Sequence, residues 1–248
     1  MNERSVQPRE RVICGIQPVR EAIAAHGAKL VRVLIWDSAD SPQLDALARF
    51  AKDRGATVAR IHRTELDKLA LGARHQGAVA LAAPLTVLSL DQLEIPEGAI
   101  LIALDELEDP QNFGAIVRSA VAMGAYAVMW PEHRSAPLSP AVFRASAGAV
   151  EHARLVCVPS LPNALTDLRE RGIQVVGLDA NGPVRIDTAD LASTVVIVVG
   201  AEGKGLRKTV RAVCDVVASL PMSGPIASLN ASVSAAVALY EARRQRGE

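Results

Sequence analysis

The chain is patterned as short apolar runs that alternate with amphipathic segments. Runs rich in Val, Ile and Leu predict buried strands, and segments with apolar residues three or four positions apart predict helices. The longest apolar runs, Ala99–Leu104 and Val195–Val199, are far too short to cross a membrane, so no membrane partner is expected. The pattern therefore favours an α/β protein.

The N-terminal part predicts a small α/β unit over residues 12–83. A flexible polar segment, residues 1–11, precedes it and lacks the apolar run of a signal peptide. Two helices are expected, one over Pro18–Ala25 and one that begins at Ser41 and ends near Gly55. The expected strands are Val31–Trp36, Thr57–Ile61 and Ala78–Leu81.

Residues 84–98 are interpreted as a linker because they contain prolines and a glycine, and residues 99–248 form a second domain. Its expected strands are Ile100–Leu104, Tyr126–Trp130, Leu155–Val158, Val175–Leu178 and Val195–Val199. Its expected helices are Gly114–Met123, Ala141–Ala149, Asn163–Arg171 and Ser232–Arg244. Apolar strands separated by helices indicate a parallel sheet covered on both faces. Such sheets bind ligands beyond the carboxyl ends of their strands, so the candidate chemistry is sought there.

An acidic, proline-containing loop follows the expected strand Ile100–Leu104 and leads into a helix. Asn112 stands near the start of that helix, where its simplest role is a cap, with a place in a ligand site as the alternative. Arg118 lies in the first turns of the same helix, after two apolar residues. It is either a solvated surface residue or part of a site at the strand ends.

A glycine-rich loop, Gly200–Leu206, follows the expected strand Val195–Val199. Its glycines allow a tight turn and a close approach of the backbone to a ligand. The loop has neither the G-x-G-x-x-G of dinucleotide sites nor the Gly-Lys-Ser/Thr of a phosphate-binding loop. Glu202 in its middle would repel a phosphate, so a ligand without phosphate is expected there.

A third polar segment, Leu220–Ser232, runs into the last expected helix. Ser228, Asn230 and Ser232 stand two positions apart at the opening of that helix. One of them is expected to cap the helix. Because capping needs only one such side chain, the other two suggest a polar site.

Composition narrows the classes of partner. The 27 basic residues balance 27 acidic residues, so a nucleic acid would have to bind a local patch or a shaped site. Aromatic residues make up 3% of the chain, which disfavours a base-stacking platform. The cysteines Cys14, Cys157 and Cys214 are isolated, which indicates a reduced cytoplasm and no metal site.

Together, the three polar segments resemble the motifs of the SpoU (TrmH) branch of the SPOUT methyltransferases. Asp109–Arg118 matches D-P-x-N-x-G-A-x-x-R, Gly200–Gly205 carries the glycine and glutamate positions of G-x-E-x-x-G, and Leu220–Ser232 matches I-P-M-x-G-x-x-x-S-L-N-x-S. Leu220 replaces the usual isoleucine and Ala231 the usual valine. Three motifs in series are far more specific than one.

The N-terminal part also resembles this family, through Cys14–Ile23 and Arg74–Ala80, which match the two ends of its L30-like RNA-binding domain. The resemblance covers nearly the whole chain. It is closest to the bacterial branch that makes 2′-O-methylguanosine in 23S rRNA. It implies an L30-like α/β domain followed by a SPOUT α/β domain with a C-terminal trefoil knot, and a homodimer in the cytoplasm.

The resemblance also implies a cofactor, S-adenosyl-L-methionine, held by the second and third motifs without a metal. The implied cofactor-binding residues are Gly200, Ala201, Glu202, Gly203, Leu220, Met222 and Leu229. The implied catalytic residues are Asn112, Arg118, Glu202, Ser228 and Asn230.

Transfer of a methyl group to a ribose requires that the 2′-hydroxyl lose its proton or that its oxyanion be stabilised. The resemblance assigns the role of general base to Arg118. Lowering a guanidinium pKa from ~13 to 7 would cost about 8 kcal/mol. We therefore expect Arg118 to grip the ribose phosphate and stabilise the developing alkoxide. Asn112 and Glu202 would orient it, and Ser228 and Asn230 would shape the site.

Two other classes of protein remain open. A nucleotide-binding enzyme such as a dehydrogenase is disfavoured by the missing G-x-G-x-x-G and the missing acidic residue about twenty positions after it. A non-catalytic RNA-binding module is disfavoured by the intact motif residues, which it would not need. Among methyltransferases, the small N-terminal domain favours rRNA over tRNA, and the antibiotic-resistance rRNA methylases share this domain.

Overall fold

The computed structural model describes residues 10–38, 40–226 and 228–247. The chain forms two compact units, one of residues up to 86 together with 147–152, the other of residues 87–146 and 153–248. Most of the N-terminal segment expected to be flexible, residues 1–9, lies outside the described residues.

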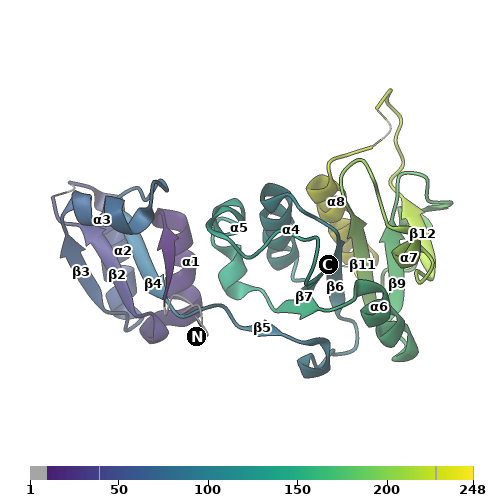
Figure 1. Cartoon of the computed structure of the whole chain (residues 1–248), viewed down its shortest axis with the longest axis horizontal. Helices are drawn as coiled ribbons and strands as arrows, with labels where there is room; N and C mark the ends of the chain where they lie inside the picture. Colours follow the sequence, from purple (N-terminus) through teal and green to yellow (C-terminus); the bar gives the residue numbers. More distant parts are fainter. Residues whose placement is uncertain (1–9, 39, 227, 248) are drawn as a thin grey trace, which may run out of the picture. The chain divides into compact units, whose positions relative to one another are not determined.

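A four-stranded sheet forms the centre of the N-terminal unit (Figure 1). Its strands are β1 (Arg11–Cys14), β2 (Arg32–Trp36), β3 (Val58–Ile61) and β4 (Ala78–Ala82), in the order β1-β4-β2-β3. Strand β4 runs antiparallel to β1 and β2, whereas β2 and β3 are parallel. The helices are α1 (Ile16–His26), α2 (Pro42–Asp53) and α3 (Arg63–Ala70), with short 3₁₀ turns at Gly27–Lys29 and Ala149–His152.

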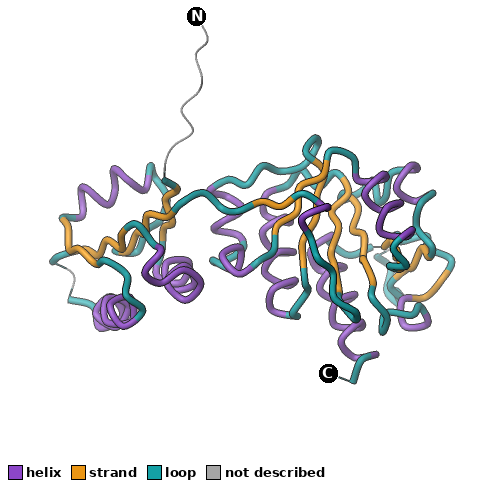
Figure 2. The backbone as a smooth tube through the Cα atoms, turned by 90° about the horizontal axis from the view of Figure 1, so that it is seen from below, coloured by secondary structure: helices purple, strands orange, loops and turns teal. Residues whose placement is uncertain are grey.

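Both faces of this sheet are covered (Figure 2). On one face Ile23 of α1 and Leu47 of α2 are buried with Ile35. On the other face Leu66 of α3 is buried with Leu34. Because neighbouring residues of a strand point to opposite faces, the run of apolar residues in β2 fills both cores.

The second unit is built on an eight-stranded sheet whose neighbouring strands are all parallel. Its strands are β5 (Val87–Leu88), β6 (Ile100–Asp105), β7 (Ala127–Pro131), β8 (Leu155–Val158), β9 (Gln174–Leu178), β10 (Val184–Arg185), β11 (Val195–Gly200) and β12 (Val216–Ser219). Their order is β10-β12-β9-β11-β6-β7-β8-β5. The α/β class and the parallel sheet predicted from the sequence are confirmed.

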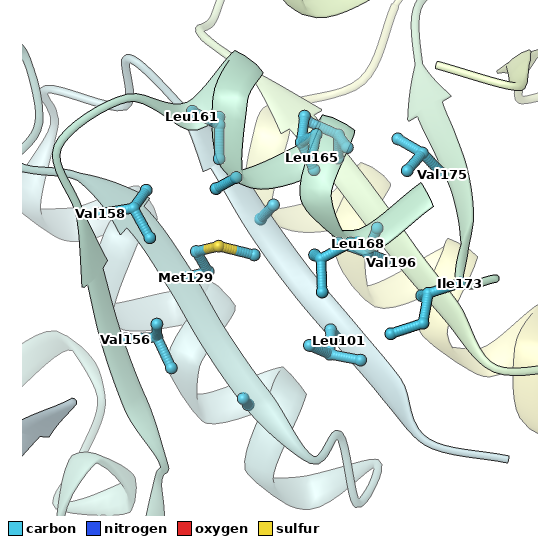
Figure 3. Close-up of a cluster of buried hydrophobic side chains, with 14 of the residues drawn as sticks. Leu101, Met129, Val156, Val158, Leu161, Leu165, Leu168, Ile173, Val175 and Val196 are labelled. Carbon is cyan, nitrogen blue, oxygen red and sulfur yellow. The ribbon is translucent and has the colours of Figure 1, made fainter. Parts of the chain in front are cut away.

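Five helices and two 3₁₀ turns belong to the described part of this unit. They are α4 (Pro110–Ala122), α5 (Pro140–Ala145), α6 (Leu161–Glu170), α7 (Lys208–Arg211), α8 (Ala231–Gln245) and the turns Leu90–Gln92 and Ile186–Thr188. Leu165 and Leu168 of α6 pack on one face of the sheet against Leu101 and Met129 (Figure 3). Strand alternation turns the buried Ile102 to the opposite face. No helix among the described residues has the length and apolarity needed to cross a membrane.

Several elements differ from the sequence prediction. Helix α4 begins at Pro110 rather than at Gly114, because Asp109 caps it and proline is favourable in the first helical turn. Helix α5 ends at Ala145, four residues earlier than predicted, and the chain then turns through Ala147, which has a positive φ of 50°. The segment predicted as a linker contains β5, which pairs with β8.

Two neighbouring central strands place the candidate loops. Strand β11 pairs with β6 in parallel, with Gly200 opposite Asp105. The glycine-rich loop and the loop that leads into α4 therefore begin at the same level of the same sheet edge.

Candidate functional site

A pocket of about 310 Å³ lies at the carboxyl ends of β9, β11 and β12. These strands are neighbours in the sheet, in the order β12-β9-β11, and the start of α8 completes the wall (Figure 1). The position is the one at which open parallel sheets bind their ligands.

The pocket gathers residues that are far apart in the sequence. All seven predicted cofactor-binding residues line it, namely Gly200, Ala201, Glu202, Gly203, Leu220, Met222 and Leu229. Three of the five predicted catalytic residues line it, namely Glu202, which belongs to both sets, Ser228 and Asn230. The second and third motifs thus form a single cavity.

The glycine-rich loop is a tight turn that only glycine permits at its first position. The N–H of Gly205 donates to the carbonyl of Ala201 at 2.9 Å and closes the turn. A Cβ on Gly200 would collide with the backbone carbonyl of Gly205 and would lie 2.7 Å from the nitrogen of Leu206. Gly205 itself has a φ of +64°. The backbone here can approach a ligand because no side chain intervenes.

Asn112 joins the first motif to the other two. Its Oδ1 accepts a hydrogen bond from Nδ2 of Asn230 at 2.9 Å, and its own Nδ2 donates to Oε2 of Glu202 at 3.1 Å. The residue is buried, with 5% of its surface exposed. Asn112, Glu202 and Asn230 therefore form one hydrogen-bonded chain across three loops.

Hydrogen bonds at the starts of α4 and α8 show which residues cap these helices. The carboxylate of Asp109 accepts from the N–H groups of Gln111 and Asn112, so the capping interpretation of Asn112 is wrong. Asn230 caps α8 by accepting from the N–H and the hydroxyl of Ser232, at 2.8 and 2.6 Å. The expectation that one polar residue of the third segment caps the helix is confirmed.

Arg118 is the predicted site residue that the structure does not bring to the pocket. It lies on the exposed surface of α4, six positions after Asn112. It makes no hydrogen bond or ion pair with residues in the described part of the chain, and it does not line the cavity. Its guanidinium is available to a partner from outside the chain.

The ion pair of the buried Asp105 with the partly exposed Arg207 was not predicted. Asp105 is fully buried at the end of β6, and it accepts from the backbone N–H of Arg207 at 2.8 Å and from its Nε at 2.6 Å. Arg207 also contacts Glu106 at 3.1 Å. Because Arg207 follows the glycine-rich loop directly, this pair fixes the end of that loop. The sequence shows an aspartate at the end of an apolar strand, but it does not show that Arg207 is the partner of this aspartate.

Asp179 was also missed, although it lines the pocket directly after β9. Its Oδ2 forms an ion pair with Nη1 of Arg211 at 2.8 Å, and its Oδ1 accepts from the N–H of Asn181 at 2.8 Å. It places a carboxylate in the pocket wall, and its N–H donates to the carbonyl of Ala218 at 3.0 Å, just before the third motif begins.

The pocket therefore combines backbone groups with acidic side chains. The thiols of Cys214 and Cys157 are poorly suited to act as nucleophiles, because the pKa of each is raised. Burial, together with the nearby carboxylates of Asp215 and Asp105, raises the pKa of Cys214 to about 11. Burial also raises the pKa of Cys157. Among the described residues, no group of three or more His, Cys, Asp and Glu side chains is arranged to hold a metal.

A glycine-lined cavity at the carboxyl edge of a parallel sheet defines a ligand-binding α/β enzyme of the open-sheet class. The SpoU rRNA Methylase family matches residues 99–240, and the domain described as RNA 2′-O ribose methyltransferase substrate binding matches residues 12–88. The chain belongs to the SpoU rRNA Methylase family. The methyltransferase activity and the N-terminal substrate-binding domain expected from the sequence are thereby confirmed.

Related proteins agree with this assignment. An uncharacterized tRNA/rRNA methyltransferase of Mycolicibacterium vanbaalenii is 40% identical over 95% of this chain and 76% of its own length. A crystal structure of an RNA 2′-O ribose methyltransferase is 30% identical, with a TM-score of 0.80 over 97% of this chain and 90% of its own.

Two further solved structures differ in how much of the chain they match. The AdoMet-bound rRNA methyltransferase of Sinorhizobium meliloti is 26% identical, with a TM-score of 0.78 over 96% of this chain and 88% of its own. The A. aeolicus TrmH/SpoU tRNA modifying enzyme is 27% identical, with a TM-score of 0.55 over 60% of this chain and 76% of its own.

Proposed function

We propose that this protein transfers a methyl group from S-adenosyl-L-methionine to the ribose 2′-hydroxyl of a guanosine in 23S rRNA. The observation that carries the proposal is the hydrogen-bonded chain of Asn230, Asn112 and Glu202 beside the glycine-lined pocket. A capping role would not require these three side chains to meet.

The pocket suits S-adenosyl-L-methionine. Gly200 and Gly203 leave backbone groups accessible, Leu220 and Leu229 supply apolar contacts, and Asp179 offers a carboxylate to hydroxyl or amino groups. The absence of a phosphate-binding loop fits a ligand that has no phosphate. When bound, this cofactor supplies a methyl group on a positively charged sulfur.

The side chains of the site would position the acceptor. Asn112 holds Glu202 and Asn230 at fixed distances, which lowers the entropic cost of bringing the ribose oxygen in line with the methyl group. Arg118, exposed and without a partner among the described residues, would bind the phosphate next to the ribose and stabilise the alkoxide that forms as the hydroxyl proton passes to water. Ser228 would contact the ribose from the pocket wall.

The active form is proposed to be a homodimer. Val233, Val237 and Tyr240 of α8 are 46%, 39% and 60% exposed. At spacings of four and three they share one face of the helix. An apolar stripe of this kind is unfavourable in water and suits a contact with a second copy. The resemblance further suggests that the C-terminal segment passes through a loop to form the trefoil knot.

Ribosomal RNA is favoured as the substrate because the match to the tRNA-modifying enzyme covers 60% of this chain, whereas the match to the rRNA methyltransferase covers 96%. The N-terminal unit, residues 12–83 with a linker over 84–98, would bind that RNA, and the protein would act in the cytoplasm. A tRNA methyltransferase and an antibiotic-resistance rRNA methylase are the alternative assignments.

The proposal is tested by incubating the protein with tritiated S-adenosyl-L-methionine and unmodified 23S rRNA or tRNA transcripts. We expect one 2′-O-methylguanosine in 23S rRNA. Incorporation into tRNA alone would support the alternative enzyme, and cofactor binding without incorporation into either RNA would contradict the proposal.

Arg118→Lys tests how the guanidinium acts. If a positive charge is enough, we expect Arg118→Lys to keep part of the transfer, about a tenfold loss, because lysine supplies the charge but not two parallel hydrogen bonds to a phosphate. Complete loss of transfer with RNA binding intact would instead indicate chemistry that requires the guanidinium. Arg144→Lys, on the exposed surface of α5, is the control. A steep pH dependence of the rate near neutrality would contradict the electrostatic role, since a guanidinium does not titrate there.

A further inference from the structure

A second cavity, of about 620 Å³, lies within the N-terminal unit and plays no part in the site described above. We call it the Trp36 pocket. Its walls come from the end of β2, the start of α2, helix α3 and the turn before β4, and its lining residues are Trp36, Ser38, Asp40, Ser41, Leu44, Arg63, Asp67, Ala73, Arg74, His75, Gln76 and Gly77.

Trp36 is unusual because the chain has only two tryptophans. Trp130 is 5% exposed and packs edge-on against Phe113 at 5.3 Å, as a core residue does. Trp36 is partly exposed and lines the cavity, and its indole N–H makes no hydrogen bond to the described residues. The guanidinium of Arg63 lies 5.3 Å from the centre of its ring. A flat apolar surface and a flat cation therefore lie together at the cavity wall.

The wall beside Trp36 is held rigidly. His75 is 8% exposed, and its Nδ1 accepts from the N–H of Gly77 at 3.0 Å, so the ring proton lies on Nε2, which donates to Asp67 at 2.9 Å. Gly77 has a φ of +84°, and a Cβ there would lie 2.7 Å from Leu44. His75 and Gly77 thus fix the turn before β4, and neither lines the pocket of the parallel sheet.

The charged residues that line the cavity are Arg63, Arg74, Asp40 and Asp67, two of each sign. Arg74 is exposed and makes no hydrogen bond or ion pair with the part of the chain that the structure describes, so its guanidinium can pair with an anion. The carboxylate of Asp67 is engaged by His75. An exposed guanidinium in the same pocket as an aromatic ring can bind an unpaired nucleotide, in which the base stacks on the ring and the phosphate pairs with the cation.

We propose that the Trp36 pocket binds an unpaired nucleotide of the RNA substrate, with the base stacked on Trp36 and Arg63 and the phosphate paired with Arg74. The scarcity of aromatic residues disfavours a broad stacking platform, but a pocket for one base needs one ring. The inference rests on the proposed function in that the ligand is RNA.

The test measures RNA binding and cofactor binding separately, with the full chain. The probes are a 23S rRNA transcript and single-stranded octaadenylate. We expect both to quench the fluorescence of Trp36 in a saturable way, whereas Trp36→Phe abolishes the quenching because the remaining Trp130 is buried. RNA bound without any quenching would overturn the proposal.

Variants then test the energetics. Trp36→Leu should raise the Kd for the transcript about tenfold, the effect of losing one stacked base. Trp36→Phe should keep most of the affinity of the unaltered protein, because it keeps an aromatic ring. Arg74→Ala should raise the Kd several-fold and weaken the dependence on salt. The matched control is Phe50→Leu, because Phe50 also carries guanidinium groups over its ring, from Arg20 and Arg54, but does not line the pocket.

Equal RNA affinities for Trp36→Leu and Phe50→Leu would overturn the proposal. Quenching by adenosine monophosphate without any effect of the variants on RNA affinity would also overturn it and would indicate a small-molecule site. The Kd for S-adenosyl-L-methionine should stay unchanged in all variants. Loss of cofactor binding in the unaltered protein would refute the proposed function while leaving the RNA result intact.

Discussion

At the scale of single residues, Asn112 shows how far a motif can be interpreted without a structure. The sequence places it at a helix start, where a cap is the simplest role, and the family motif gives it a second role. The structure separates the two, because Asp109 supplies the cap and leaves the Asn112 side chain to Glu202 and Asn230. Contacts across 90 and 118 positions cannot be obtained from local patterns.

Asn112→Ala should reduce methyl transfer by about a hundredfold, which is typical of removing a group that positions the reacting centre. It should also destabilise the fold by about 1–3 kcal/mol, because the amide of Asn230 loses its acceptor. Single-turnover rates and denaturant unfolding measure the two effects. Gln111→Ala, at the exposed neighbouring position, is the control, and equal rates for both variants would refute the role of Asn112.

At the scale of elements, the order of strands and helices was largely predictable, because uninterrupted apolar strands and amphipathic helices have distinct periods. The elements that were missed carry weak patterns. Strand β10 has two residues, and helix α3 is half charged and buries only Leu66 and Ala70. Their places depend on contacts with the rest of the sheet.

The turn after β11 predicts that alanine substitutions at two glycines of the pocket loops will affect cofactor affinity very differently. Gly200→Ala should raise the Kd for S-adenosyl-L-methionine at least about tenfold, since the new Cβ would collide with the backbone of Gly205 and open the turn. Gly224→Ala should be tolerated, because no heavy atom lies within 4 Å of the added Cβ and its φ is not positive. Calorimetric titration of both variants distinguishes them, and similar affinities would refute the role of the turn.

The loop that follows β11 should also depend on the ion pair at its end. Arg207→Ala leaves the buried carboxylate of Asp105 without its cation and should destabilise the protein by about 3–5 kcal/mol. Arg171→Ala, which removes an exposed pair with Asp167, should cost at most about 1 kcal/mol. Urea unfolding measures both, and a small loss for Arg207→Ala would show that the pair does not hold the loop.

At the scale of the whole molecule, the sequence predicted the parallel sheet and the residues that line its pocket. The pairing of β6 with β11 is what brings the motifs together, and a one-dimensional pattern does not contain it. Arg118 shows the remaining gap, since its motif position is clear while the structure leaves it outside the pocket of its own chain.

The exposed face of α8 makes a prediction for the assembly. If the protein is the homodimer proposed above, Val237→Glu combined with Tyr240→Glu should convert it into a monomer, because charges within an apolar contact are costly to bury. Sedimentation velocity measures the change, and Leu71→Glu, at an apolar position that is 90% exposed in the N-terminal unit, is the control. An unaltered sedimentation coefficient would mean that this face is not the dimer contact.

The pairing of residues 100–105 with residues 195–200 has a consequence for biosynthesis. While the ribosome makes the segment between them, β6 lacks one of its two neighbours and its open edge can pair with other strands. Contacts of such sequence separation form slowly. The N-terminal unit, apart from residues 147–152, is complete by Thr86 and can fold early, so the nascent enzyme would acquire its RNA-binding part well before its catalytic centre.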